Sequence, residues 1–115
     1  MEEQKNNGPL SGIRVLDMSR ILAGPSSAQL LGDLGADVIK IEVPGQGDLA
    51  RQLGADPELN EKGMGASFLA QNSGKRSLTL NLKRSEGREI FFKLVEQADV
   101  VVENFRPGVM EGLGL

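Results

Sequence analysis

Two pairs of basic residues flank one apolar stretch in the second half of the chain. Lys75 and Arg76 precede this stretch, and Lys83 and Arg84 follow it. Lysine and arginine are the usual donors to phosphate and carboxylate groups, so the four side chains could form an anion site. A solvated surface is the commoner role of such charge runs and is the favoured interpretation. The anion site is kept as the alternative.

A second group of candidate ligand-binding residues is Asn104, Phe105 and Arg106, followed by Pro107 and Gly108. The amide could hydrogen-bond a ligand, the ring could cover a flat group such as adenine, and the guanidinium could pair with phosphate. An ordinary turn from a strand into a helix would also contain proline and glycine in this order. Spacing alone does not separate the two interpretations.

The segment 19–25 is a third candidate, because it leaves an expected strand and opens an expected helix. Backbone N–H groups and the helix dipole at such a position favour an anion. The segment lacks the G-x-G-x-x-G pattern, so a nicotinamide dinucleotide is disfavoured, although Glu42 stands where such proteins hold the ribose. Gly45 and Gly47 indicate a turn rather than a phosphate loop.

The composition narrows the possible chemistry. The chain has no cysteine and no histidine, which removes thiolate chemistry, the most common general base and the most common metal ligand. We therefore expect no catalytic and no metal-binding residues, and we expect Asp17 to be a structural hydrogen-bonding group. A net charge of −3 and only four aromatic residues argue against nucleic acid as a partner. No signal peptide and no apolar run of about 18 residues is present, so we expect a cytoplasmic protein without a membrane span.

Apolar periodicity predicts an α/β fold with an open parallel sheet. Strands are expected at residues 13–18, 38–42, 77–82 and 99–103, and helices at 25–34 and 85–97. The first strand, helix and strand form a right-handed βαβ unit, which places a ligand at the carboxyl ends of the strands. The fourth strand is apolar enough for burial on both faces.

The remaining segments are expected to be less regular. Residues 43–73 show no sustained period apart from a helical turn near 66–70, and such a long irregular stretch is typical of a segment that serves a site or a partner. Residues 1–8 are expected to be a flexible tail, and residues 9–115 a single domain.

Taken together, these motifs resemble the amino-terminal part of the class III CoA-transferases. This family includes formyl-CoA transferase, carnitine CoA-transferase and α-methylacyl-CoA racemase. The resemblance runs from residue 9 to the end of the chain. It is carried by PLSGIRVLD at 9–17, AGP at 23–25, LGDLGADVIKIE at 31–42, PG and GD within 44–48, NSGKRS at 72–77 and VENFRPG at 102–108.

The resemblance implies a Rossmann-like large domain that binds CoA, followed in the whole protein by a small domain, in a homodimer of two interlocked chains. It also implies that CoA is a substrate rather than a tightly bound cofactor, and that it lies across the carboxyl ends of the strands. Leu22 stands where some transferases carry Gln, and Gly112 lies near the place where many members carry Arg. The residues implied to contact CoA are Arg20, Ile21 and Leu22 near the acyl region, and Leu80, Lys83, Asn104, Phe105 and Arg106 towards the adenosine and phosphate end.

Three functions follow from the resemblance. In the first, the protein moves CoA between an acyl-CoA and a carboxylic acid, after an Asp beyond Leu115 attacks the thioester to form a covalent intermediate. In the second, it is an acyl-CoA racemase or epimerase that uses bases also located beyond Leu115; the apolar Leu22 mildly favours this alternative. In the third, the chain is a non-catalytic CoA-binding fragment. We expect the 115-residue chain to be truncated and inactive alone.

Overall fold

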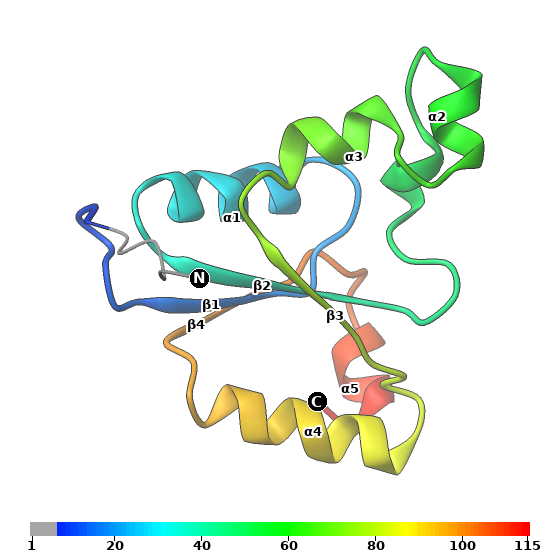
Figure 1. Cartoon of the computed structure of the whole chain (residues 1–115). Coiled ribbons are helices and arrows are strands. Elements are labelled where there is room, and N and C mark those ends of the chain that lie inside the picture. The colour runs from blue at the N-terminus through cyan, green and yellow to red at the C-terminus, as the bar shows by residue number, and fades with distance from the viewer. Residues whose placement is uncertain (1–6) are drawn as a thin grey trace.

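A computed structural model describes residues 7–115 of the chain, and the greater part of the expected flexible tail lies outside these residues. The chain alternates strands and helices as the sequence predicts (Figure 1). In chain order the elements are β1 (Arg14–Asp17), α1 (Ala23–Asp33), β2 (Asp37–Glu42), the 3-10 helix η1 (Leu49–Gln52), α2 (Pro57–Glu61), α3 (Ala66–Gln71), β3 (Arg76–Thr79), α4 (Ser85–Val95), β4 (Val100–Val102) and α5 (Val109–Leu113).

The four strands form one parallel sheet in the order β3-β2-β1-β4. The central strand β1 pairs Leu16 with Ile39 of β2 on one side and with Val101 of β4 on the other. The chain therefore adds strands in one direction from β1 to β3 and then returns to the opposite side of β1. This reversal creates a switch point between β1 and β4, and ligands of open α/β sheets bind outside the carboxyl ends of the strands at such a point. The predicted α/β class with an open parallel sheet is confirmed.

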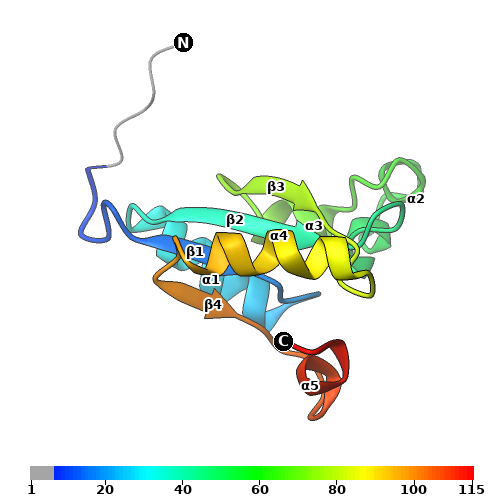
Figure 2. The same ribbon diagram turned by 90° about the horizontal axis from the view of Figure 1, so that it is seen from below.

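Helices cover both faces of the sheet, with α1 and α3 on one face and α4 on the other (Figures 1 and 2). Because side chains alternate along a strand, each strand contributes to both faces. The core beneath α4 is apolar and consists of Leu16, Met18, Ile39, Ile41, Leu80 and Phe91.

The face beneath α1 is divided along the direction of the strands. Its amino-terminal half is apolar and contains Val15, Ala28, Ala36 and Val38. Nearer the carboxyl ends of the strands, the inward positions hold Asp17, Lys40 and Glu42, all of which are buried. Charged side chains are rarely buried without partners, so this half of the face must be held together by ion pairs.

The strand β4 differs from its prediction. Val100 and Val101 are 38% and 40% exposed, because β4 lies at the edge of the sheet formed by the described residues and pairs there with β1 alone. A run of valines fits a pleated strand in any position, so composition did not reveal that this strand lies at the edge. The third strand is also shorter than predicted and ends at Thr79.

The helices begin and end close to their predicted positions. Helix α1 starts at Ala23, two residues before Pro25, which is acceptable because the first four N–H groups of a helix have no partner within it. The residue that caps α4 is Arg84, and no side-chain hydrogen bond closes that end. The irregular stretch 43–73 contains η1, α2 and α3, of which only α3 had a sequence signal. None of the helices in residues 7–115 is long and apolar enough to cross a membrane.

Candidate functional site

A cavity of about 580 Å³ opens at the carboxyl edge of the sheet. Every strand contributes to it, because each chain segment that leaves a strand passes along its wall. Such a volume lies within the usual range of about 300–1,000 Å³ for small-molecule sites. The lining residues are Met18 and Arg20 after β1, Ile41 to Pro44 around the end of β2, Leu80 to Lys83 after β3, Phe105 and Arg106 after β4, and Val109 and Leu113 of α5.

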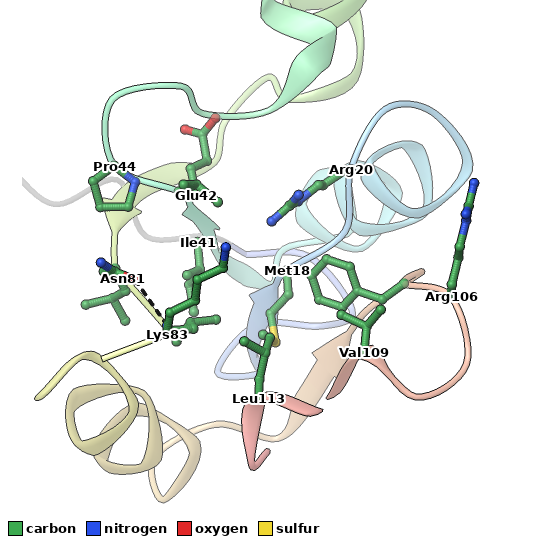
Figure 3. Close-up of a pocket in the computed structure, with 14 residues that line it drawn as sticks. Met18, Arg20, Ile41, Glu42, Pro44, Asn81, Lys83, Arg106, Val109 and Leu113 are labelled. Atoms are coloured by element: carbon green, nitrogen blue, oxygen red, sulfur yellow. Dashed lines mark hydrogen bonds between the residues drawn. The ribbon is translucent and has the colours of Figure 1, made fainter. Parts of the chain in front are cut away.

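Three cationic side chains line the cavity, each from a different loop. Figure 3 shows that Arg20 and Lys83 point towards the middle of the cavity from different sides, whereas Arg106 lies further out. The Arg20 guanidinium lies 5.1 Å from the centre of the Phe105 ring, within the range of a cation–π contact. The cavity thus has positive charge around a flat aromatic surface.

The opposite part of the wall is apolar. Met18, Ile41 and Leu80 belong to the buried core beneath α4 and also line the cavity. Val109 and Leu113 extend this surface from α5 (Figure 3). Cations beside an apolar surface suit a ligand that has both anionic groups and a flat or aliphatic part.

Five of the eight residues that sequence analysis selected line the cavity. They are Arg20, Leu80, Lys83, Phe105 and Arg106. Ile21 and Leu22 are exposed next to it and are not among the lining residues. Asn104 is also outside the lining and binds the protein itself, since its side chain accepts from Arg20 N and donates to Arg20 O, both at 2.9 Å.

The wall formed by the ends of β1 and β2 was not predicted from the sequence. Met18, Ile41, Glu42, Val43 and Pro44 line the cavity because β1 and β2 end at the same edge as β3 and β4. The rule that ligands bind at strand ends was a usable signal for these positions. Four of these side chains are apolar and gave no chemical signal to supplement it, and Glu42 gave only the weak ribose signal described above.

The hypothesis that Lys75 and Arg76 belong to an anion site is wrong. Lys75 is buried and donates to Asp17 at 2.7 Å, to Pro25 O at 2.9 Å and to Asn72 Oδ1 at 2.7 Å. Burial lowers the pKa of Lys75, although its hydrogen bond to Asp17 works in the opposite direction. Asp17, which also accepts hydrogen bonds from Ser19, is a structural group as expected.

Arg76 is likewise occupied by a partner within the protein. It forms a bidentate pair with Asp37, which also binds Arg14. Partial burial by itself would raise the pKa of Asp37, but the hydrogen bonds from the two guanidinium groups outweigh it and hold the pKa below its usual value. Lys75 and Arg76 thus form ion pairs with Asp17 and Asp37 of neighbouring strands. Lys83, at the other end of β3, lines the cavity.

Glu42 has a structural partner rather than a ribose. Its carboxylate forms a bidentate pair with Arg51, with both N–O distances at 2.8 Å, and accepts from Asp48 N. The Arg51 guanidinium lies 3.8 Å from the centre of the Phe68 ring, which connects this pair to α3. Burial would raise the pKa of Glu42, but these hydrogen bonds hold it below its usual value. Gly45 and Gly47 both have positive φ, in agreement with a turn.

Comparison with known proteins shows the family to which this chain belongs. The family model described as CoA-transferase family III matches residues 10–115. The chain belongs to this family.

Relatives within the family are similar over almost the whole chain. An acyl-CoA transferase of Fusarium pseudograminearum is 48% identical over 96% of the chain. A succinyl-CoA:mesaconate CoA-transferase of Haloarcula marismortui is 52% identical over 90%, and a formyl-CoA:oxalate CoA-transferase of Escherichia coli is 48% identical over 92%. The matches cover 25%, 26% and 25% of these three relatives, respectively. The chain therefore spans about a quarter of their length.

Solved structures agree with this assignment. The protein Rv3272 of Mycobacterium tuberculosis is 44% identical with a TM-score of 0.83, and the match covers 96% of this chain and 29% of that one. A CaiB/BaiF family protein of Brucella suis is 45% identical with a TM-score of 0.81, and the match covers 95% and 29%, respectively. The family III fold is therefore shared by the described residues, including the sheet edge at which the cavity lies.

Three of the four charged side chains that line the cavity of this family III chain are cations. Among residues 7–115, no group of three or more His, Cys, Asp or Glu side chains could hold a metal ion. The carboxylates near the cavity are engaged in ion pairs, as Asp17 is with Lys75, Glu42 with Arg51, and Asp48 with Lys40. The groups at the cavity that take no part in these ion pairs are the three cations, the Asn81 side chain, the Phe105 ring and the apolar wall.

Proposed function

We propose that this chain is the CoA-binding segment of a CoA-transferase and that the cavity holds the adenosine and phosphate end of CoA. The whole protein then moves CoA from an acyl-CoA to a carboxylic acid through an Asp nucleophile beyond Leu115. The names of two relatives, succinyl-CoA:mesaconate and formyl-CoA:oxalate CoA-transferase, support this class of reaction because each combines a CoA thioester with a carboxylic acid. They favour a transferase over a racemase.

The observation that supports the binding site most strongly is the combination of Phe105 with cations from three loops. The 3′-phospho-ADP part of CoA has an adenine ring and several phosphate oxygens. The Phe105 ring offers a surface on which adenine can stack, and Arg20, Lys83 and Arg106 can donate to phosphate. The position also agrees with the switch point between β1 and β4, since Arg20 follows β1 and Phe105 follows β4.

The affinity of the 115-residue chain for CoA should be modest. The three cations are exposed, and exposed ion pairs contribute little because water screens them. Stacking and burial against the apolar wall must therefore supply much of the free energy of binding. We expect a dissociation constant of about 1 µM to 1 mM, which corresponds to about −8 to −4 kcal/mol.

Isothermal titration calorimetry of the chain with CoA and with dephospho-CoA tests this proposal. Replacing Lys83 with Gln should weaken CoA binding by about tenfold, because one phosphate loses a charged donor. Lys62, an exposed lysine that does not line the cavity, provides the matched control Lys62→Gln. Absence of CoA binding in the millimolar range, or equal effects of the two variants, would contradict the proposed site.

A further inference from the structure

The loop between β1 and α1 contains the one non-glycine residue with positive φ in the described chain. Ile21 has a φ of 73°, and Leu22 N donates to Arg20 O at 3.2 Å across it. This is a γ-turn with a positive central φ, which is the rarer and more strained of the two kinds. A β-branched residue is an unusual occupant of this conformation. Such backbone strain persists only where surrounding contacts impose it.

Polar side chains from three separate segments bind the backbone of three successive residues in this loop. Lys40 of β2 donates to Ser19 O at 3.0 Å. Asn104 binds Arg20 N and Arg20 O, as described above. Both carboxylate oxygens of Asp48 accept from Ile21 N, at 3.1 and 3.2 Å. The strained turn is therefore imposed by contacts with distant parts of the chain.

Lys40 and Asp48 form the buried centre of this set of contacts. Their side chains are joined at 2.9 Å and are 2% and 1% exposed. Asp48 also accepts from Ala50 N at the start of η1, so its carboxylate is fixed on several sides. Lys40 has the Asp17 carboxylate as a second, more distant counter-ion at 4.0 Å. The pair connects β2 and η1 to the loop, and Arg20 is the loop residue that reaches the cavity.

We propose that Asp48, held by Lys40, is a positioning residue for the ligand site. Its carboxylate holds Ile21 in the strained turn, and the turn directs Arg20 towards Phe105 at the cavity wall. Asp48 is not among the cavity-lining residues, so it acts through Arg20 rather than on the ligand. Only the identity of the ligand rests on the proposed function.

The first arm of the test examines the turn by NMR and needs no ligand. In the unmodified chain we expect a strong intraresidue HN–Hα NOE at Ile21, because positive φ brings these two protons together. Asp48→Ser keeps an N-cap residue type for η1 but removes the carboxylate; it should weaken this NOE and accelerate exchange of the Ile21 amide by about tenfold. Asp56→Ser is the matched control, since Asp56 caps α2 at an exposed position far from the loop in sequence.

Two results of this arm would overturn the proposal. One is a weak HN–Hα NOE at Ile21 in the unmodified chain, a measurement that holds even if Asp48→Ser does not fold. The other is a folded Asp48→Ser variant in which both the NOE and the exchange rate of Ile21 are unchanged.

The second arm measures CoA affinity in a double-mutant cycle between Asp48 and Arg20. Asp48→Ser should weaken CoA binding by about tenfold in the natural background and by a much smaller factor in the Arg20→Gln background. Equal losses in the two backgrounds would show that Asp48 does not act through Arg20. If the unmodified chain does not bind CoA, the proposed function fails, whereas the NMR arm still decides whether Asp48 holds the turn.

Discussion

Lys75 donates a 2.7 Å hydrogen bond to Asp17, and the two side chains are only 3% and 0% exposed. This contact joins the segment before β3 to the carboxyl end of β1, 58 residues away in the sequence. Asp17 leads directly into the loop that contains Arg20. The ion pair therefore supports the backbone from which one wall of the cavity is built.

Replacing Lys75 with Met should destabilise the chain by about 3–5 kcal/mol, because Asp17 would remain buried and charged with only the more distant Lys40 as counter-ion. The double variant Asp17→Asn, Lys75→Met should be more stable than the single variant, since no unpaired charge is left. Urea unfolding followed by circular dichroism measures both free energies. Lys62→Met, at an exposed position, should change the free energy of unfolding by less than about 0.5 kcal/mol. A similarly small effect of Lys75→Met would contradict this prediction.

The lowered pKa of Glu42 predicts that the chain loses stability in acid. Its pKa in the folded chain lies below the usual value of 4.5, because the hydrogen bonds from Arg51 and Asp48 N outweigh the effect of burial. Between the two pKa values the unfolded chain binds more protons, so the stabilising contribution of Glu42 is present above about pH 4.5 and is lost as the pH falls through the folded-state pKa. Urea unfolding at a series of pH values should show this decline.

The variant Glu42→Gln should reduce the slope of stability against pH below this point. Part of the slope should remain, since the pKa of Asp37 is also lowered. Glu96→Gln, which removes a carboxylate at an exposed position, is the control. An identical slope in the Glu42→Gln variant would show that the carboxylate does not contribute.

Gly87 should resist replacement although it lies within helix α4. A Cβ atom at this position would lie 2.0 Å from Asn81 O, in the loop that carries Lys83 to the cavity. The clash should outweigh the better helix propensity of alanine, so Gly87→Ala should destabilise by about 1–3 kcal/mol. Gly112 in α5 has open space around it, and Gly112→Ala should stabilise by up to about 1 kcal/mol. Thermal unfolding of the two variants tests this difference in sign.

The exposed edge of β4 should promote self-association of the 115-residue chain. One side of β4 pairs with β1, the other has no strand beside it among residues 7–115, and Val100 and Val101 are exposed. An unpaired apolar edge is a template for a strand from another molecule. Sedimentation velocity should show larger species that decrease in the variant Val101→Lys. Leu30→Lys removes an exposed apolar side chain from α1 instead and should have little effect. Equal effects of the two variants would indicate nonspecific hydrophobic association rather than pairing at the edge of β4.

The sequence was sufficient for the fold because its signals are local. The short apolar stretches of β1 and β2 and the helical period of α1 between them identify the first βαβ unit, and a parallel sheet follows from that unit. The chemical types of Lys83 and Phe105 and their positions after strands then identified part of the cavity. Both inferences depend on residues close together in the chain.

The ion pairs were beyond such reasoning because their partners are distant in sequence. Lys75 looked like a candidate anion ligand until the fold placed Asp17 beside it. Asn104 was expected to face a ligand, but its amide binds the backbone of Arg20. A charged or amide side chain looks the same in a sequence whether its partner is a substrate or another part of the chain.

The return of β4 to β1 has a consequence for the order in which the site can assemble. Arg20 and Asn104 are 84 residues apart, yet they bind one another next to the cavity. Closing so long a loop is entropically costly, and such non-local contacts slow folding. During synthesis on the ribosome, a nascent chain that stops before Asn104 has β1, α1 and β2 but lacks the wall that contains Phe105. The binding edge is therefore among the last parts of this segment to form, and a ligand that touches both walls distinguishes the finished fold from every shorter precursor.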